Sequence, residues 1–304
     1  MEKRISRSEL LFSLGFLFML VCAVGAFFYG VKIGSDKTET KYLEMKELKA
    51  STGKSETYQQ QDLVSFYHTV FLPYREFQNE WFSAARKMEQ GESADSESIL
   101  KQLASLAAKQ YKEAAAHNQQ APLLGQSQVD YLQSLKLFKK ELNALADTSS
   151  NLDSAEMMKR LKTSPSIQNA VQKSLAAQQA YYSAMLKWSS AVDQNIPSAY
   201  KSTSVIEVSK WKSLPLVVKN KLMADQLLSR KKLTSYYPHD LTSRIDLFIA
   251  SGHASQMKLK TIQAIIDLLI STEAIRSGDF TSSKGALYSK DLLPQLPFFF
   301  SEKS

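Results

Sequence analysis

The sequence contains few of the residues from which many metal and redox sites are built. Its 304 residues include a single cysteine, Cys22, and four histidines. One cysteine cannot form an intramolecular disulfide or a cysteine-built zinc or iron–sulfur site. Ten glycines and eight prolines are too few for a collagen-like, linker-like or turn-rich all-β chain. What remains is a globular composition, with 44% hydrophobic and 22% charged residues.

Motifs of common catalytic sites are also missing. The sequence has neither the glycine pattern of a phosphate-binding loop or dinucleotide fold nor a GxSxG or HExxH motif. His239, Asp240, Asp246 and His253 lie close together in the sequence, but a metal ion needs three or four ligands that converge. The sequence therefore predicts no catalytic residues, no metal site and no cofactor, and it favours a non-catalytic protein.

One long apolar run stands near the N-terminus. Leu10 to Val31 are 22 residues without a charge, which as a helix span about 33 Å, enough to cross a bilayer. A cleavable signal peptide ending near Ala26 is the alternative, but the apolar run continues through Tyr29 and is longer than a usual signal core. We therefore predict a retained transmembrane signal anchor at residues 10–31.

The order of the first segments predicts an orientation. A short basic tail, residues 1–9, is followed at once by the apolar run, as in export signals. The polar stalk at residues 32–57 is also rich in lysine, so basic residues counted alone do not favour either orientation. We predict a single-pass protein of the cell membrane with a cytoplasmic N-terminus and an extracytoplasmic domain at residues 58–304.

Small residues repeat every four positions along the predicted anchor. They are Cys22, Ala26, Gly30 and Gly34. Small residues at this spacing share one helix face and let two membrane helices approach closely. The sequence thus offers a packing face for self-association, although glycine and alanine are also simply common in membrane helices.

Residues 58–304 show helical periodicity almost throughout, which predicts an all-α, multi-helix bundle. Apolar residues in a 4-3-4-3 rhythm form one stripe in its first part. They are Leu63, Tyr67, Val70, Tyr74, Phe77, Trp81, Ala84 and Met88. We expect this stripe to be buried against other helices and Pro73 to kink or divide its helix. The alternative is a partner-binding surface.

Capping residues predict where several helices begin and end. Gly91 is expected to end the first helix, Asp95 to begin the second, and Ser127 with Asp130 to begin the third. Ser164 followed by proline is typical of an N-cap and first helical residue.

A last long helical region is expected from an N-cap at Asp240 to Arg276, ending at Gly278. Gly252 either breaks this region or allows a close helix crossing. The part between Ile262 and Ile270 is apolar on nearly all sides, which predicts a central, buried helix. Only residues 203–211 have some strand-like character.

A weak internal repeat relates residues 58–147 to residues 164–276. A shift of 107 positions aligns Tyr74 with Tyr181 and Trp81 with Trp188. Duplication of a helical hairpin is one explanation. Two amphipathic helices that both need aromatic side chains are the other.

The positive charge of the exported part is concentrated in one segment. Residues 201–232 hold eight basic and two acidic residues, for a net charge of +6. The residues predicted to contact an anionic surface are Lys210, Lys212, Lys219, Lys221, Arg230, Lys231 and Lys232. Anionic lipid or an acidic envelope polymer fits this charge. Nucleic acid is not expected, because no aromatic–basic motif accompanies the lysines. The alternative is a solvated helix face.

An apolar segment at residues 292–300 ends in three phenylalanines. Such a patch invites association when it is exposed, so we expect it to pack against the bundle. Exposed, it would instead dock on a membrane interface or a partner.

Together these features predict a single-pass, membrane-anchored helical binding or scaffold protein of the cell envelope. Its expected partners are the membrane and another protein or a second copy of the chain. The alternative is an envelope enzyme or ligand-binding receptor whose site is assembled from residues distant in sequence. A pocket with two or more convergent ionisable side chains would favour that alternative.

Overall fold

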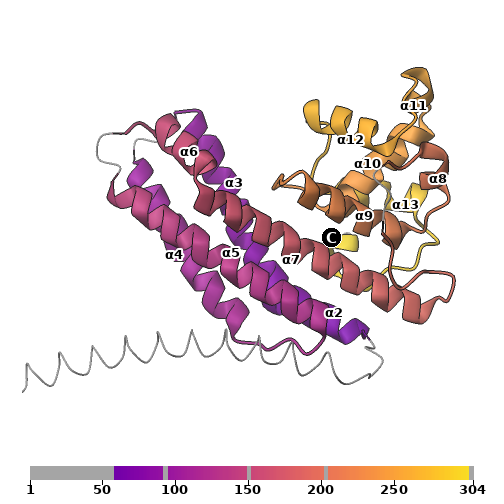
Figure 1. Ribbon diagram of the computed structural model, residues 1–304, viewed down its shortest axis with the longest axis horizontal. Helices are drawn as coiled ribbons and strands as arrows, with labels where there is room; N and C mark the ends of the chain where they lie inside the picture. Colours follow the sequence, from indigo (N-terminus) through magenta and orange to yellow (C-terminus); the bar gives the residue numbers. More distant parts are fainter. Residues whose placement is uncertain (1–57, 92–94, 149–151, 202–204, 301–304) are drawn as a thin grey trace, which may run out of the picture. The chain divides into compact units, whose positions relative to one another are not determined.

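The computed structural model describes residues 58–91, 95–148, 152–201 and 205–300, and every regular element in these ranges is a helix (Figure 1). In chain order they are α2 (Gln60–Phe66), the π-helical turn η1 (Tyr67–Phe71), α3 (Leu72–Glu89), α4 (Ser96–Ala115), α5 (Pro122–Asp147), α6 (Ser154–Thr163), α7 (Pro165–Val192), α8 (Val208–Lys212), α9 (Leu216–Ser229), α10 (Pro238–Ala250), α11 (His253–Gln256), α12 (Ile262–Ser271), α13 (Asp279–Leu287) and the 3₁₀ turn η2 (Pro297–Phe299). The predicted all-α helical bundle is confirmed for these ranges.

The predicted membrane segment lies outside the described residues, as do the tail at residues 1–9 and the whole stalk at residues 32–57. Among the helices that the structure describes, none combines the length and apolarity needed to cross a bilayer. The packing face of Cys22, Ala26, Gly30 and Gly34 also lies outside the described residues.

The apolar stripe of the first helices is buried along its whole length. Its eight side chains are at most 8% exposed, so the prediction of a core seam is confirmed. Pro73 lies in the first turn of α3, directly after the π-helical turn η1. Proline cannot donate a backbone hydrogen bond, and the wider turn before it lets the helix continue. The helix is therefore divided in hydrogen-bond pattern while the seam stays continuous.

Helices α3, α4, α5 and α7 form the first half of the domain, in which α5 packs against both α4 and α7 (Figure 1).

Three predicted helix boundaries are confirmed, two starts and one end. The Asp95 carboxylate accepts a hydrogen bond from the Ser98 amide at 3.0 Å, and Ser164 Oγ accepts one from the Ile167 amide at 3.4 Å. Gly91 ends α3 with a φ of +69°, which glycine adopts without strain.

The predicted helix start at Ser127 is wrong. Helix α5 begins five residues earlier, at Pro122, so Ser127 and Asp130 lie inside it. Ser127 Oγ donates to the Ala177 carbonyl at 2.7 Å, and Asp130 pairs with Lys173 at 3.0 Å. Polar residues that resemble a cap in the sequence instead join α5 to α7.

The second half of the domain is built from shorter helices. Helix α9 packs on α7 and α10, and α10 packs on α13. The last long helical region, predicted from Asp240 to Arg276, is divided into α10, α11 and α12. Gly252 breaks the run with a φ of +80°, and no atom lies within 4 Å of a Cβ placed there. It therefore provides a turn and not a close helix crossing.

Two further predictions for this half are corrected. Gly278 is left-handed, with a φ of +90°, but it precedes α13, because α12 already ends at Ser271. Helix α12 is not central: Ile262, Ile265, Ile266 and Leu269 are buried while Asp267 is exposed. An Asp on its outer side makes α12 amphipathic.

The apolar C-terminal segment packs into the domain, as predicted. Leu293, Leu296 and Phe299 are at most 4% exposed. The Phe298 ring lies parallel to the ring of His239 and within 5.5 Å of the rings of Tyr67 and Phe71. The segment thus joins the first helices of the domain to α10.

Candidate functional site

The structure divides the seven predicted anion-contacting residues into two sets. Lys219 is 9% exposed and its ammonium lies 3.0 Å from both carboxylate oxygens of Asp246. Lys221 pairs with Asp225 at 2.6 Å, and Arg230 pairs with Asp267 at 2.7 Å. These three cations already have protein partners. The exposed members, which form no ion pair with another described residue, are Lys210, Lys212, Lys231 and Lys232.

The exposed lysines stand at opposite ends of α9. Lys210 and Lys212 belong to α8, which precedes α9, while Lys231 and Lys232 follow its last turn. The 14 residues of α9 separate them by roughly 20 Å. The exposed positive charges of residues 201–232 therefore do not form one continuous patch.

Helix α8 is held in place by a largely buried carboxylate, that of Asp246. Trp211, which is fully buried, donates from its indole nitrogen to Asp246 at 2.6 Å. The Tyr288 hydroxyl donates to the other oxygen of Asp246 at 2.7 Å, and Lys219 bonds to both oxygens. Asp246 thereby links α8, α9, α10 and the end of α13. Lys210 and Lys212 flank Trp211, so this network fixes the backbone that carries them.

The segment before α8 is extended and not a strand. Ile206 accepts a backbone hydrogen bond from Ile262 at 2.8 Å, and Val208 donates one to Lys260 at 3.0 Å. Glu207 and Thr261 form an isolated antiparallel bridge, after which the chain turns into α8. Of the predicted strand-like stretch, 205–207 are extended, the residues from Val208 are helical, and 203 and 204 lie outside the described residues.

The backbone pairing of residues 206–208 with residues 260–262 places further residues beside α8, which the sequence pattern did not predict. Lys258 and Lys260, on the connection from α11 to α12, are exposed beside α8. Met257 is 51% exposed and Val205 is 53% exposed in the same two segments. We call Lys210, Lys212, Lys258, Lys260, Val205 and Met257 the basic α8 surface. Nothing in the sequence spacing links its two parts.

His239 lies at the centre of an aromatic cluster. It is 1% exposed, and its Nδ1 shares a hydrogen bond of 2.7 Å with the Tyr182 hydroxyl. The rings of Tyr237 and Phe298 stack on it at 5.0 Å. Burial, reinforced by the nearby Arg75 guanidinium, holds the pKa of His239 well below its usual range. The imidazole is therefore neutral and enclosed by rings.

Arg75 is a buried cation beside this cluster. Its guanidinium lies 4.1 Å from the centre of the Tyr237 ring, and it donates to the Ser235 carbonyl at 3.0 Å and to Gln78 at 3.1 Å. Gln78 donates in turn to the Thr234 carbonyl at 2.9 Å. These bonds hold the connection between α9 and α10 against α3.

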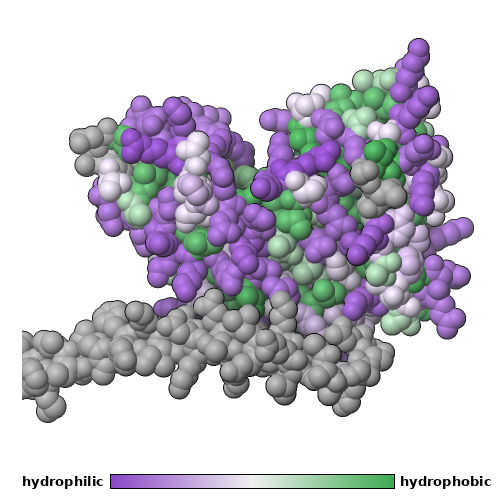
Figure 2. Space-filling model, in the orientation of Figure 1, coloured by the Kyte–Doolittle hydropathy of each residue, from purple (hydrophilic) through white to green (hydrophobic). Residues whose placement is uncertain are grey.

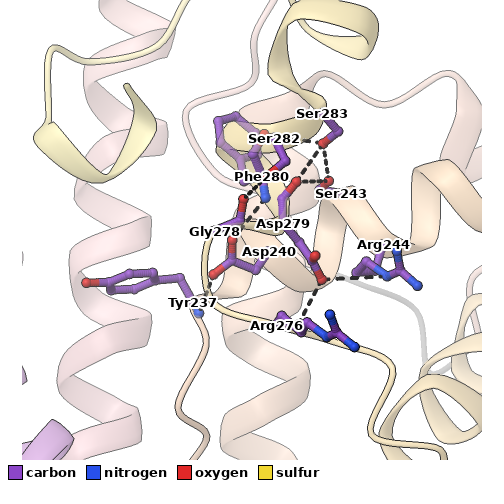
Figure 3. Close-up of polar contacts among 10 residues, drawn as sticks. All are labelled: Tyr237, Asp240, Ser243, Arg244, Arg276, Gly278, Asp279, Phe280, Ser282 and Ser283. Carbon is purple, nitrogen blue, oxygen red and sulfur yellow. Dashed lines mark hydrogen bonds and ion pairs between the residues drawn. The ribbon is translucent and has the colours of Figure 1, made fainter. Parts of the chain in front are cut away.

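Asp240 ties together the first turns of two helices (Figure 3). It is not the N-cap of α10, as predicted, because Tyr237 occupies that position. Its carboxylate accepts hydrogen bonds from the amide of Tyr237 at 2.9 Å and from the amide of Phe280, in α13, at 3.0 Å. Burial raises the pKa of Asp240 to about 6, although both hydrogen bonds act in the opposite direction.

The sequence cluster of His239, Asp240, Asp246 and His253 is not brought together as one site. Asp246 binds Trp211, Lys219 and Tyr288, whereas His253 bonds to Ser251 at 2.7 Å. Within the part of the chain that the structure describes, no three His, Cys, Asp or Glu side chains could hold a metal ion together.

Comparison with known proteins adds no relative. No protein-family model matches the chain, and neither a curated protein nor a solved structure shows significant similarity to it.

His239 and Asp240 are expected to give opposite pH dependences of stability in residues 58–304. Below about pH 6.5 the unfolded chain protonates His239 and the folded domain does not, so the domain loses up to about 1.4 kcal/mol per pH unit. Asp240 has a raised pKa of about 6, so its contribution is fully present below about pH 4 and is lost as the pH rises through 6.

Urea unfolding of the wild type, His239→Gln and Asp240→Asn at pH 7.5 and pH 5 separates the two effects. On acidification the stability deficit of His239→Gln should shrink, because this variant lacks the titrating ring. The deficit of Asp240→Asn should grow. Equal shifts in all three proteins would contradict both assignments.

Proposed function

We propose that the chain is a single-pass, membrane-anchored helical protein of the cell envelope that acts by binding or scaffolding and not by catalysis. The observation that carries this proposal is the uncharged run Leu10–Val31 directly behind a short basic tail. In the proposed arrangement residues 1–9 are cytoplasmic, residues 10–31 span the membrane, residues 32–57 form a stalk, and the domain at residues 58–304 is extracytoplasmic.

The structural roles of the ionisable groups at two places in the described part of the domain support binding over catalysis. The alternative, an envelope enzyme or ligand-binding receptor, needs a pocket with convergent ionisable side chains. A shallow hollow beside α4 is lined by Asp95, Glu97 and Lys101, but Glu97 pairs with Lys101 and Asp95 caps the helix. The buried His239 is enclosed by aromatic rings. In both places the ionisable groups have structural partners.

The proposed partners follow from two surfaces. The exposed lysines of α8 would contact anionic lipid or an acidic envelope polymer. The face of Cys22, Ala26, Gly30 and Gly34 would pack against a second copy or another membrane protein.

Cysteine labelling of the full-length chain tests the anchor and its orientation. Ser51→Cys, in a Cys22→Ser background, should react with a membrane-impermeant thiol reagent on intact cells, because the stalk is exported. The intact mass of the protein from the membrane fraction should include residues 1–31. Labelling only after lysis would reverse the orientation, and a soluble chain that begins at Phe27 would overturn the anchor.

A further inference from the structure

The basic α8 surface joins two segments that lie about 50 residues apart in the sequence. The backbone bonds of Ile206 with Ile262 and of Val208 with Lys260 hold residues 205–212 beside residues 257–262. Figure 1 shows α8 and α11 on the same side of the second half of the domain. The lysines of both segments therefore face solvent from one region.

The charge of this surface is strongly unbalanced. Lys210, Lys212, Lys258 and Lys260 are all exposed, and none forms an ion pair with a described residue. Glu207 is the sole acidic residue in the two segments, and its carboxylate lies 3.4 Å from Ser209 Oγ. Because the four lysines are separated and do not converge on one small ion, this surface suits an extended anionic partner, such as a polymer or a lipid surface.

Apolar side chains stand among these lysines. Met257 and Val205 are two of the four large hydrophobic side chains that are most exposed among the described residues. Met257 follows directly after α11, which lies at the edge of the domain (Figure 1), and Lys258 continues the turn with a φ of +55°. In Figure 2 the right-hand edge of the drawn face, where α8 and α11 lie in Figure 1, is mostly hydrophilic. Lysines around an exposed apolar side chain are typical of surfaces that lie in a membrane interface.

We propose that the basic α8 surface rests on an anionic lipid bilayer, with its four lysines at the headgroups and Met257 entering the interface. This inference depends on the proposed function, because the anchor and stalk keep the domain beside the membrane and raise its effective concentration there. An acidic polymer would satisfy the lysines but offers Met257 no apolar environment. Each lysine near an anionic surface favours the docked state by roughly fivefold, so the four together matter.

The test uses the full-length chain in proteoliposomes, with Cys22→Ser and Met257→Cys and a solvent-sensitive fluorophore on the new thiol. In phosphatidylcholine containing phosphatidylglycerol, the emission should shift to shorter wavelength and be quenched by nitroxide-labelled lipid. In phosphatidylcholine alone it should stay as in water. Raising the salt from about 0.1 M to 1 M, which shortens the screening length from about 10 Å to 3 Å, should reduce the shift.

A matched pair of variants isolates the lysines. Changing Lys210, Lys212, Lys258 and Lys260 to glutamine should lower the ratio of docked to undocked protein roughly 10²–10³-fold. Removing four exposed charges elsewhere, in the control variant with Lys112, Lys136, Lys139 and Lys140 changed to glutamine, should leave the shift intact. The same fluorophore at Ser105→Cys on α4 should report water in every vesicle.

The outcomes separate this inference from the anchor. A probe that stays in water while the chain floats with both vesicles overturns lipid docking and leaves the anchor standing. A shift that survives the change of all four lysines of the basic α8 surface to glutamine also overturns it. Binding of soluble polyglutamate that depends on the four lysines, with no shift on vesicles, would assign the surface to an acidic polymer. Flotation only with phosphatidylglycerol would overturn the anchor but support docking, and flotation with neither would overturn both.

Discussion

Replacing Trp81 with alanine is expected to lower the free energy of unfolding of residues 58–304 by about 3–5 kcal/mol. The Trp81 side chain is 7% exposed, and its ring lies 5.0 Å from the ring of Phe138 in α5. Phe77 packs on the same Phe138 ring at 5.0 Å. The truncation therefore opens a cavity between α3 and α5, which the neighbouring aromatic side chains cannot fill without leaving their own contacts.

Urea unfolding followed by circular dichroism measures this effect. Trp81→Phe should cost less than the alanine change, because a six-membered ring still occupies part of the site. Val192→Ala, at a side chain that is 55% exposed, is the control and should change stability by less than about 0.5 kcal/mol. If Trp81→Ala leaves the stability unchanged, the seam is a binding surface and not the core.

Replacing Asp246 with alanine is expected to destabilise the domain by about 3–5 kcal/mol, because it leaves a buried ammonium without its counter-charge. The side chains of Lys219 and Asp246 are 11% and 13% exposed. The same change removes the acceptor for the Trp211 indole and for the Tyr288 hydroxyl. Exposed ion pairs contribute far less, so Glu97→Gln, in a pair whose side chains are about half exposed, should cost much less than the Asp246 change.

A double-mutant cycle tests whether the unpaired lysine causes this loss. Lys219→Met combined with Asp246→Ala should be more stable than Asp246→Ala alone, because the buried charge is gone. Additive effects of the two changes would show that Asp246 acts mainly through Trp211 and Tyr288. A cost below 1 kcal/mol for Asp246→Ala would contradict the network as a whole.

The helical seam could be predicted because its signal is local. Residues such as Trp81 and Met88 recur at the helical period, and a cap such as Asp95 bonds within its own first turn. The start of α5 was predicted wrongly at Ser127, because serine and aspartate also form hydrogen bonds and ion pairs between helices. Pro122 was the stronger signal of a helix start. The proposed repeat stays a prediction, since burial of Trp81 and Trp188 satisfies either explanation.

The candidate site could be predicted only in part. A sequence shows which residues are charged, but it mostly does not show which residues pair with them. The pairing of Lys221 with Asp225, four residues apart on α9, has a sequence signature. That of Lys219 with Asp246, 27 residues away, has none. Lys258 and Lys260 join Lys210 only through backbone bonds between α8 and the segment before α12.

The position of Phe298 has a consequence for the order of assembly during synthesis. Its ring contacts Tyr67 and Phe71, which leave the ribosome early, as well as Tyr237 and His239. The N-terminal residues of a chain leave the ribosome first, and contacts between residues distant in sequence form late. Tyr67 and Phe71 therefore lack their contacts with Phe298 until residues 293–299 have been synthesised. In the proposed exported chain, these aromatic side chains would cross the membrane before the segment that covers them.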